Sequence, residues 1–444
     1  NAVLLVFSLV FYAWGEPLYI LLLVGMAFAD WYLTLIMSQY KKGSVKAKLF
    51  LGLTVGIDLI LLGIFKYGSF ILSNIKFFTG FPAKVPSIML PIGISFYTFQ
   101  LITYCVDVYR GDALPQRSFK TLLLYVSLFH QCIAGPIVRY KDVCAELENR
   151  RATQIEIADG INRFTVGLAK KAIIANTCAA LADTLLVPDG GDFSLLASKS
   201  ALSLWVGVLA FTLQIYIDFS AYSDMAIGMG KMIGIHYTEN FDYPYISSSV
   251  SEFWRRWHMS LSSWFKEYVY VPLGGNRKGL ARQLLNIAIV WALTGLWHGA
   301  SWNFVVWGLF HGVFLVLERM LPIEKFLRFR LIQNIYALLV VMVGWVFFRA
   351  ENLTAALDYL KRMFVPYKTD VYSAYLSNEF MMVAALGLVS CGFLTLIFDK
   401  LPVKTEYKFG FLRLVNPAWC AVIAYFSVLL LASNTYNPFI YFRF

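Results

Sequence analysis

Residues Ser251 to Gly279 read SEFWRRWHMSLSSWFKEYVYVPLGGNRKG, and residues Leu293 to Gly312 read LTGLWHGASWNFVVWGLFHG. Together these stretches hold three of the five histidines of the chain, His258, His298 and His311. The last two lie in apolar sequence that we expect to cross a membrane. An ionisable side chain in the hydrocarbon of a bilayer costs at least about 2.5 kcal/mol, so such a residue is a candidate functional group. We expect the rest of the chain to build a tunnel around these stretches.

The composition of the chain indicates its broad class. Hydrophobic residues make up 59% and charged residues 15% of the 444 residues, and the mean hydropathy is +0.63, whereas soluble domains are about 45–50% apolar and about 25% charged. The sequence therefore predicts an all-α, polytopic membrane protein. The formal net charge of +11 would also suit nucleic-acid binding, but the basic residues form short clusters between apolar runs, as the positive-inside rule requires. We therefore expect contact with membrane lipid and no nucleic acid.

Apolar runs predict about eleven spans in a single integral-membrane domain, residues 1–444, with no internal repeat and no soluble domain. The first run, AVLLVFSLVFYAW, follows no basic residue and has no small-residue cleavage site, so we expect a retained span rather than a signal peptide. Basic loops at residues 41–48 and 400–413 are expected in the cytoplasm, which places the tail at residues 433–444 outside. The other expected spans are about Pro17–Gln39, Leu49–Tyr67, Leu90–Gly111, Phe119–Tyr140, Arg163–Val187, Ala197–Phe219, Leu284–Gly299, Asn334–Phe348, Phe380–Phe398 and Leu414–Ala432.

The cysteines form no C-x-x-C pair and have no histidine at metal-ligand spacing. We expect them to pack as small apolar side chains, with neither a disulfide framework nor a metal site. They are Cys105, Cys132, Cys144, Cys178, Cys391 and Cys420.

Apolar residues at three- and four-residue spacing predict one short helix from Phe253 to Phe265. His258 lies one turn from Trp254 and Leu261, so we expect its ring to point inward with the apolar face. That face comprises Phe253, Trp254, Trp257, Leu261, Trp264 and Phe265.

His298 is expected deep in the membrane. It lies sixteen residues after Arg282, which is about 24 Å along a helix, against a hydrocarbon core of about 30 Å. Gly295 and Gly299 flank it at a spacing that permits close approach of another helix or of a substrate.

His311 lies thirteen residues beyond His298. On one continuous helix that separation is about 20 Å, with a rotation of about 140°. The two histidines would therefore share a site only if the helix breaks. We expect His311 to pack near Gly308 and Gly312.

Polar residues interrupt two other apolar runs. In QIYIDFSAYSDMAIGMG, carboxylates must be paired or face water, so this group either lines a tunnel or fixes the fold through a polar network, with direct catalysis disfavoured. His130, in the run from Phe119 to Tyr140, is either a tunnel-wall residue or a hydrogen-bonded packing residue. The interrupting residues of the first run are Asp218, Ser220, Tyr222, Ser223 and Asp224.

The loop from Val271 to Gly279, VPLGGNRKG, is rich in glycine and basic residues. It is not a Walker motif, because the spacing is wrong and no Ser or Thr follows Lys278. Arg277, Lys278 and Arg282 either meet the phosphates of a cytosolic donor or supply ordinary positive-inside charge.

Seven motifs follow one another along the chain: LPIGISFYTFQ at Leu90–Gln100, IAGPIVRY at Ile133–Tyr140, IDFSAYSDMAIG at Ile217–Gly228, ENFDYPY at Glu239–Tyr245, FWRRWHMSLSSWF at Phe253–Phe265, PLGGNR at Pro272–Arg277 and GLWHGASWNFVVWG at Gly295–Gly308. This set resembles the membrane-bound O-acyltransferase family, and within it the bacterial branch of AlgI and PatA type that O-acetylates cell-wall or exported polysaccharides. The resemblance covers nearly the whole chain. Its one departure is Ala221, where the branch usually has Gly, and this small change puts little in doubt.

The resemblance implies a ring of transmembrane helices around a catalytic tunnel, with donor and acceptor approaching from opposite faces. His298, in the WHG motif, matches the family's essential histidine, and His258, in RRWHMS, matches its second functional position. The implied donor is acetyl-CoA, used as a substrate, with no bound cofactor and no metal. We expect substrate-binding residues within the same motifs, at Trp297, Asn303, Arg277, Asp218 and Tyr222.

The chemistry of imidazole agrees with this expectation. Acyl transfer from a thioester to a hydroxyl needs removal of the hydroxyl proton as the C–O bond forms, and a neutral imidazole suits that task near pH 7. We assign His298 as the general base and His258 as a residue that orients the donor or supports the base. The sequence has no G-x-S-x-G elbow and no Cys beside a His with a third orienting group, so a covalent serine or cysteine enzyme is not expected.

The tail contains Phe439-Ile440-Tyr441-Phe442-Arg443-Phe444, an F-x-Y-x-x-F pattern. It is similar to the C-terminal motif of the small peptide that works with the D-alanyl-transferring relatives. The similarity implies an acyl relay, in which Tyr441 receives acetyl through the tunnel and passes it to an extracytoplasmic SGNH-type acetyltransferase that modifies a polysaccharide. The alternative role is an aromatic anchor at the outer interface. The implied location is the bacterial cytoplasmic (inner) membrane, with multiple passes.

Two other functions stay open at this point. A transporter or channel would use intramembrane His and Asp residues for proton relay or substrate binding, although no inverted repeat is evident. A D-alanyl transferase would share nearly every motif. The tyrosine motif within the chain and PLGGNR favour acetyl transfer.

Overall fold

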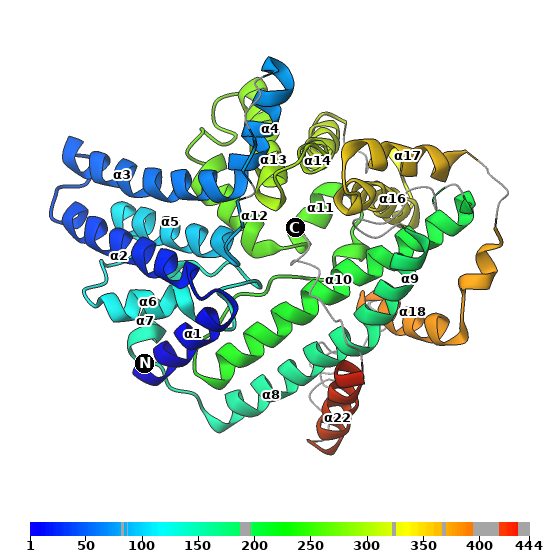
Figure 1. Ribbon diagram of the computed structural model, residues 1–444, viewed down its shortest axis with the longest axis horizontal. Helices are drawn as coiled ribbons and strands as arrows, with labels where there is room; N and C mark the ends of the chain where they lie inside the picture. Colours follow the sequence, from blue (N-terminus) through cyan, green and yellow to red (C-terminus); the bar gives the residue numbers. More distant parts are fainter. Residues whose placement is uncertain are drawn as a thin grey trace. The chain divides into compact units, whose positions relative to one another are not determined.

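The computed structural model describes residues 1–80, 84–86, 88–186, 196, 198–321, 326–365, 370–393 and 417–433. Throughout these ranges the regular elements are helices (Figure 1), and they form two compact units. Unit 1 comprises Asn1–Ile161 with Ala226–Thr238, and unit 2 comprises Asn162–Met225 with Glu239–Phe444. Two helices, α8 (Gln154–Ala169) and α10 (Ala201–Met232), contribute residues to both units.

Within the described ranges, seven helices are long and apolar enough to cross a membrane. They are Tyr19–Ser38, Val45–Thr79, Gln154–Leu185, Ala201–Met232, Leu280–His298, Trp302–Met320 and Arg330–Arg349, and shorter apolar helices lie at Ala2–Gly15, Asn378–Ser390 and Ala418–Ser433. The prediction of an all-α, polytopic membrane protein is confirmed. The ring of helices around a tunnel and the single domain stay predictions. The structure does not describe the basic loop at residues 400–413 or almost all of the tail at residues 433–444.

Unit 1 is built around α5 (Ile94–Arg110), of which 14 of the 17 residues are buried. The helix begins after Gly93, whose φ of +77° suits glycine, and a Cβ there would meet the Cys132 carbonyl oxygen at 2.4 Å. Gly93 therefore lets the start of α5 pass close to the backbone of Cys132. Beside α5 in Figure 1 run α2 (Tyr19–Ser38) and α3 (Val45–Leu62), with α1 (Ala2–Gly15), α4 (Gly68–Thr79), α6 (Phe119–Ser127) and α7 (Tyr140–Glu148) completing the unit.

The predicted span from Phe119 to Tyr140 is wrong, because α6 ends at Ser127 and the chain stays irregular until α7. Gly135-Pro136 lies in this segment, where Gly135 has a φ of +101°. Buried irregular backbone must find hydrogen-bond partners inside the protein. Here the Gln131 side chain donates to the Tyr125 carbonyl at 2.6 Å, and the Tyr125 hydroxyl donates to the Val138 carbonyl at 2.7 Å.

His130 lies in the same irregular segment and is 1% exposed. Its Nε2 is 2.7 Å from the hydroxyl of Tyr237, also in unit 1. This hydrogen bond favours the packing role over the tunnel-wall role.

His236 joins three parts of unit 1. Its Nδ1 lies 2.8 Å from Oε1 of Glu146 on α7, and its Nε2 lies 3.1 Å from Oε1 of Glu156 on α8. The backbone N–H of His236 donates to Oε2 of Glu146 at 2.8 Å. The hydrogen bond to Glu146 and the charges of both glutamates raise the pKa of His236 above its usual value, against a smaller opposing effect of burial.

Replacing His236 by alanine is expected to remove a stabilisation that depends on pH. Because the folded-state pKa is raised, the protonated ring stabilises unit 1 below the unfolded pKa of about 6.5, and this contribution is lost as the pH rises through the folded-state pKa. The side chain is 45% exposed, so the effect should stay below about 1 kcal/mol. Thermal unfolding in detergent on both sides of that pKa measures it. A gap between wild type and variant that widens with rising pH would contradict the assignment.

Unit 2 holds the remaining helices. Those that position the site are α11 (Val250–Arg256), α12 (Met259–Phe265), α13 (Leu280–His298), α14 (Trp302–Met320) and α16 (Arg330–Arg349). Around them lie α9 (Asn176–Leu185), α17 (Leu353–Phe364), α18 (Asn378–Ser390) and α22 (Pro417–Ser433).

Carboxylates on α10 are paired with cations from a π-helical segment, Lys170–Ala175, as burial in a membrane requires. Lys171 lies 2.9 Å from Asp218, and Lys170 lies 2.8 Å from Asp224. Arg163 of α8 lies 2.9 Å from Asp224 as well. These ion pairs favour the fold-fixing role of the polar run over a tunnel-lining role.

The cysteines behave as small core residues. All six are free, and five of them are buried, with Cys144 partly exposed.

Candidate active site

The chain has a helix break between His298 and His311, which is the condition for these two histidines to share a site. The helix α13 ends at His298, because Gly299 is extended with φ −165° and ψ 151°, and α14 begins at Trp302. The distance and rotation calculated for one continuous helix therefore do not apply between His298 and His311.

Glycines let α13 and α14 pack at very short range. A Cβ on Gly295 would lie 2.3 Å from the Phe304 carbonyl oxygen, and a Cβ on Gly308 would lie 2.3 Å from the Trp291 carbonyl oxygen. Gly299 lies against the ring of Phe304, where a Cβ would come within 2.2 Å. The small-residue spacing therefore brings two helices together, as predicted.

The ring of His298 sits among aromatic side chains at the end of α13. The residue is 7% exposed, and its ring centroid lies 4.9 Å from Trp297, 4.9 Å from Trp307 and 5.2 Å from Phe348. All three contacts are edge-to-face. These rings fix the imidazole and exclude bulk water from it.

His258 occupies a sharp turn between α11 and α12. Its backbone is in the left-handed region, at φ 44° and ψ 54°, which is uncommon for a residue other than glycine. The prediction of one helix from Phe253 to Phe265 is therefore wrong. The six apolar residues of the predicted face are all buried nonetheless, and His258 is 1% exposed, so its inward direction is confirmed.

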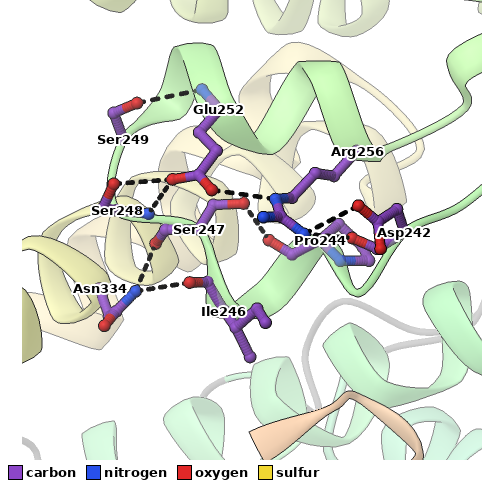
Figure 2. Close-up of polar contacts among 9 residues, drawn as sticks. All are labelled: Asp242, Pro244, Ile246, Ser247, Ser248, Ser249, Glu252, Arg256 and Asn334. Carbon is purple, nitrogen blue, oxygen red and sulfur yellow. Dashed lines mark hydrogen bonds and ion pairs between the residues drawn. The ribbon is translucent and has the colours of Figure 1, made fainter. Parts of the chain in front are cut away.

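Polar contacts hold the segment before His258 in place (Figure 2). Glu252 of α11 accepts hydrogen bonds from the Ser248 N–H and hydroxyl at 2.8 and 2.7 Å, and it pairs with Arg256 at 2.9 Å. Arg256 also reaches Asp242 at 2.9 Å. Burial raises the pKa of Glu252, but the bonds from Ser248 and the charge of Arg256 outweigh it and lower the pKa.

Two further side chains anchor this segment to neighbouring helices. Asn334 of α16 donates to the carbonyls of Ile246 and Ser247 at 2.7 and 2.8 Å (Figure 2). Glu318 of α14 accepts from the N–H groups of Val250 and Ser251 at 2.7 and 2.8 Å, which caps the N-terminus of α11. The segment that leads into the turn at His258 is therefore anchored to α14 and α16.

A hydrogen-bond network determines which nitrogen of His258 carries its proton. Asn240 Oδ1 faces the backbone N–H of Ser260 at 3.3 Å and its hydroxyl at 2.8 Å, so this atom must be the amide oxygen. The amide nitrogen donates to Ser223 at 3.0 Å. His258 Nδ1, 3.0 Å from the same oxygen, must then be the donor. Nε2 keeps its lone pair, and it has no hydrogen-bond partner within the described residues.

Trp297 brings the two candidate histidines together. The centroid of its ring lies 6.0 Å from that of His258 and 4.9 Å from that of His298. Phe219 packs edge-to-face on His258 at 4.7 Å. The result is one dry aromatic site in unit 2 with two imidazoles.

His311 lies close to this site, on the far side of Trp307. Its ring centroid is 5.3 Å from Trp307, 4.9 Å from Trp254 and 5.8 Å from Trp291. Gly344 provides the space, since a Cβ there would lie 2.5 Å from His311 Nε2. Gly344 on α16 therefore lies against the ring of His311 as well, and packing of His311 near Gly308 and Gly312 stays a prediction.

The predicted substrate-binding residues are placed differently from one another. Asp218 is 1% exposed and paired with Lys171, and Tyr222 is partly buried on α10. Asn303 is buried and donates to the carbonyls of Phe347 and Ala350 at 3.2 and 2.7 Å, which ties α14 to the end of α16. Arg277 is exposed in the glycine-rich loop. Trp297 lies against both histidines, and Tyr441 lies outside the described residues.

Sequence reasoning missed the residues that orient His258. Asn240 lies in the ENFDYPY motif, and Ser260 and Ser223 lie in two others. Asn240 is 1% exposed. The amide of Asn240 inside a motif was the signal that the sequence offered. The sequence does not show that its partner is His258, eighteen residues away.

Comparison with known proteins shows the family of the chain. Residues 113–349 match the membrane-bound O-acyltransferase family. The probable alginate O-acetylase AlgI of Pseudomonas putida is 37% identical, over 100% of this chain and 94% of the relative. The peptidoglycan O-acetyltransferase of Helicobacter pylori is 35% identical, over 80% and 72%. The teichoic acid D-alanyltransferase of Bacillus subtilis is 27% identical, over 50% and 58%.

The chain belongs to the membrane-bound O-acyltransferase family. It is an acyltransferase and a multi-pass membrane protein, which excludes the transporter alternative.

Proposed function

We propose that the protein is an O-acetyltransferase of the bacterial cytoplasmic membrane, which moves acetyl from acetyl-CoA towards a cell-wall or exported polysaccharide. The two acetylating relatives described above, from Pseudomonas putida and Helicobacter pylori, match 100% and 80% of the chain at 37% and 35% identity. The D-alanyltransferase of Bacillus subtilis matches 50% of the chain at 27% identity. This difference favours acetyl over D-alanyl transfer.

The observation that carries the proposal is the pair of buried imidazoles on either side of Trp297. Burial lowers the pKa of His258 to about 3, so its imidazole is neutral at physiological pH. His258 presents a lone pair at Nε2, and the aromatic wall around both rings excludes water that would hydrolyse a thioester. A site of this kind suits proton abstraction from a hydroxyl.

His298 is the proposed general base. Its imidazole takes the proton of the acceptor hydroxyl as that oxygen attacks the thioester carbonyl, so a C–O bond forms and the C–S bond breaks. The imidazolium then returns the proton to the departing thiolate, which leaves as free CoA. Nε2 of His258 accepts a hydrogen bond. His258 thereby orients the acyl donor, or supports His298 as the base.

The proposed substrate contacts follow from where the residues lie. Trp297 lies against both histidines and would contact the acetyl group, and Arg277 is exposed in a basic loop that suits the phosphates of CoA. Asp218 and Asn303 are engaged with Lys171 and with α16. Their contribution is to hold the helices that carry the site, whereas Tyr222 on α10 stays a proposed substrate contact.

The relay through Tyr441 and its partner remain part of the proposal. Tyr441 would accept acetyl as a phenyl ester and pass it to an extracytoplasmic SGNH-type acetyltransferase that modifies the polysaccharide. The support is the F-x-Y-x-x-F pattern at residues 439–444.

Replacing Tyr441 by phenylalanine is expected to abolish acetylation of the polysaccharide, because the change removes only the accepting oxygen. Protein level and melting temperature should match wild type. The mass of the tail peptide, after incubation with acetyl-CoA, reads the same step directly. Tyr436→Phe, which alters another tail tyrosine, is the control. Normal acetylation in the Tyr441 variant would refute the relay and leave the acyltransferase itself in place.

Replacing Asn240 by alanine is expected to lower turnover about 10- to 100-fold, the usual effect of removing a group that orients a reactive imidazole. The substitution frees Nδ1 of His258, so its proton is no longer fixed there. Asn240→Asp is the matched control, because a carboxylate still accepts from Nδ1–H and should retain more activity. The fall should be in kcat, with KM for acetyl-CoA little changed. Equal activity of the alanine and aspartate variants would contradict the orienting role.

A further inference from the structure

Arg163 of α8 joins two parts of the chain beside the network that orients His258. Its Nε and Nη2 donate to Oδ1 of Asp224 on α10 at 3.1 and 2.9 Å, and its Nη1 donates to Oε1 of Glu239 at 2.6 Å. The chain leaves unit 2 after Met225 and returns to it at Glu239. The arginine bridge, which we define as these contacts of Arg163, therefore joins the chain where it leaves unit 2 to the chain where it returns.

The two carboxylates of the arginine bridge are sequence neighbours of residues that hold His258. Asn240 follows Glu239, and Ser223 precedes Asp224. The Asn240 amide nitrogen donates to the Ser223 hydroxyl at 3.0 Å, and the amide oxygen lies 3.0 Å from Nδ1 of His258. The bridge therefore runs beside the hydrogen bond between Asn240 and Ser223 and fixes the same two backbone segments.

Compensation of charge does not require Arg163. Asp224 is the less exposed of the two carboxylates, at 18%, and it has a second cation, since Nζ of Lys170 lies 2.8 Å from its Oδ2. The side chain of Glu239 is 54% exposed, so water can solvate its charge. Arg163 adds fixed geometry instead, because its rigid planar guanidinium can hold two carboxylates at once in defined directions.

Close packing of two helices gives the arginine bridge a rigid base. One turn beyond Arg163 on α8, a Cβ on Gly167 would lie 2.7 Å from the carbonyl oxygen of Ala221 on α10. The backbones of the two helices are therefore in close contact here. Because α10 also carries Ser223 and Asp224, this contact sets the distance that the Arg163 side chain spans.

We propose that Arg163 is a positioning residue for His258. The arginine bridge holds Asn240 opposite Ser223, and the Asn240 oxygen keeps the proton of His258 on Nδ1. Nε2 of His258 then keeps the lone pair that the proposed acetyl transfer uses. The inference rests on the proposed function for the use of this lone pair, whereas the position of the proton can be measured without it.

Turnover of an Arg163→Gln variant tests this role. Thiol release from acetyl-CoA should fall about 3- to 30-fold in kcat, the size of effects that pass through chains of contacts, with KM for acetyl-CoA little changed. Arg163→Lys keeps the charge but cannot hold two carboxylates in the same geometry, so it should recover little of the loss. Full activity of Arg163→Lys would show that charge alone matters and would overturn the positioning role.

Lys170→Gln is the matched control. It removes the other cation of Asp224 and leaves the contact between Arg163 and Glu239 in place. Its turnover per folded molecule should stay close to wild type, and its melting temperature shows how much stability one cation beside Asp224 contributes. Equal losses of kcat in Lys170→Gln and Arg163→Gln would mean that the ion pairs act only through folding, and would overturn the proposal.

A double-variant cycle shows whether Arg163 acts through Asn240. In an Asn240→Ala background the amide that transmits the effect is absent, so Arg163→Gln should lower kcat little further. A structural role elsewhere would lower kcat by the same factor in both backgrounds. That result, or wild-type kcat in the single Arg163→Gln variant, would overturn the proposal.

The ring nitrogens of His258 give a second readout that needs no acyl donor. In nitrogen NMR spectra of protein with isotope-labelled histidine, a protonated ring nitrogen and one with a lone pair give well-separated signals. The signals of His258 are identified by their loss in a His258→Gln variant. Wild type and Lys170→Gln should show the proton on Nδ1, whereas Arg163→Gln should show both tautomers. The same single tautomer in all three proteins would overturn the proposal, whether or not acetyl-CoA is the donor.

Discussion

Replacing His298 by glutamine is expected to lower turnover of the acyl thioester by at least about 100-fold, the contribution of a positioned general base. The amide keeps polarity and approximate size but cannot take a proton at neutral pH. The ring it replaces is fixed by Trp297, Trp307 and Phe348, so no other group can move into the same position. The loss should be in kcat, measured as free thiol released from acetyl-CoA by purified protein.

His130→Gln is the matched control for this variant. His130 is as deeply buried and is hydrogen-bonded to Tyr237, so glutamine there tests the general effect of losing a buried imidazole. It should leave turnover per folded molecule close to wild type. Comparable losses from the two substitutions would mean that His298 acts through folding rather than through chemistry.

Replacing Gly295 by alanine is expected to destabilise the protein by about 1–3 kcal/mol, the usual cost of overpacking, and to reduce turnover as well. The new Cβ would lie 2.3 Å from the Phe304 carbonyl oxygen, which is backbone of α14 and cannot rotate away. The two helices must therefore separate. Because His298 lies one turn further along α13, the displacement also moves its ring.

Gly56→Ala on α3 isolates this effect. A Cβ at Gly56 has no atom within 4 Å, and alanine in a helix is favoured over glycine by about 1 kcal/mol. The control should be neutral or stabilising, and both variants can be compared by thermal unfolding in detergent. A Gly295→Ala protein as stable and as active as Gly56→Ala would show that α13 and α14 are not held at this short range.

Hydrophobic periodicity predicted the helical class and the buried side of the residues before His258, but not the turn at His258. The six apolar residues keep their spacing through that turn, so the pattern looks like one helix. Asn240 contacts His258 itself, and Asn334 and Glu318 hold the segment before it; all three lie far from their partners in the sequence. Local pattern cannot reveal long-range contacts of this kind.

Glycine and proline, in contrast, did carry signals for the breaks. Gly299 ends α13, and Gly135-Pro136 lies in the irregular segment after α6.

The most direct test of the central claim is thiol release from acetyl-CoA by the purified wild-type protein beside the His298→Gln variant. If the proposed acetyl transfer is correct, the wild type releases thiol from acetyl-CoA. The His298→Gln variant should release it at least about 100-fold more slowly. Equal release from both proteins would contradict the role of His298. No release from either, with membrane lipid and the polysaccharide-modifying partner supplied, would contradict acetyl-CoA as the donor.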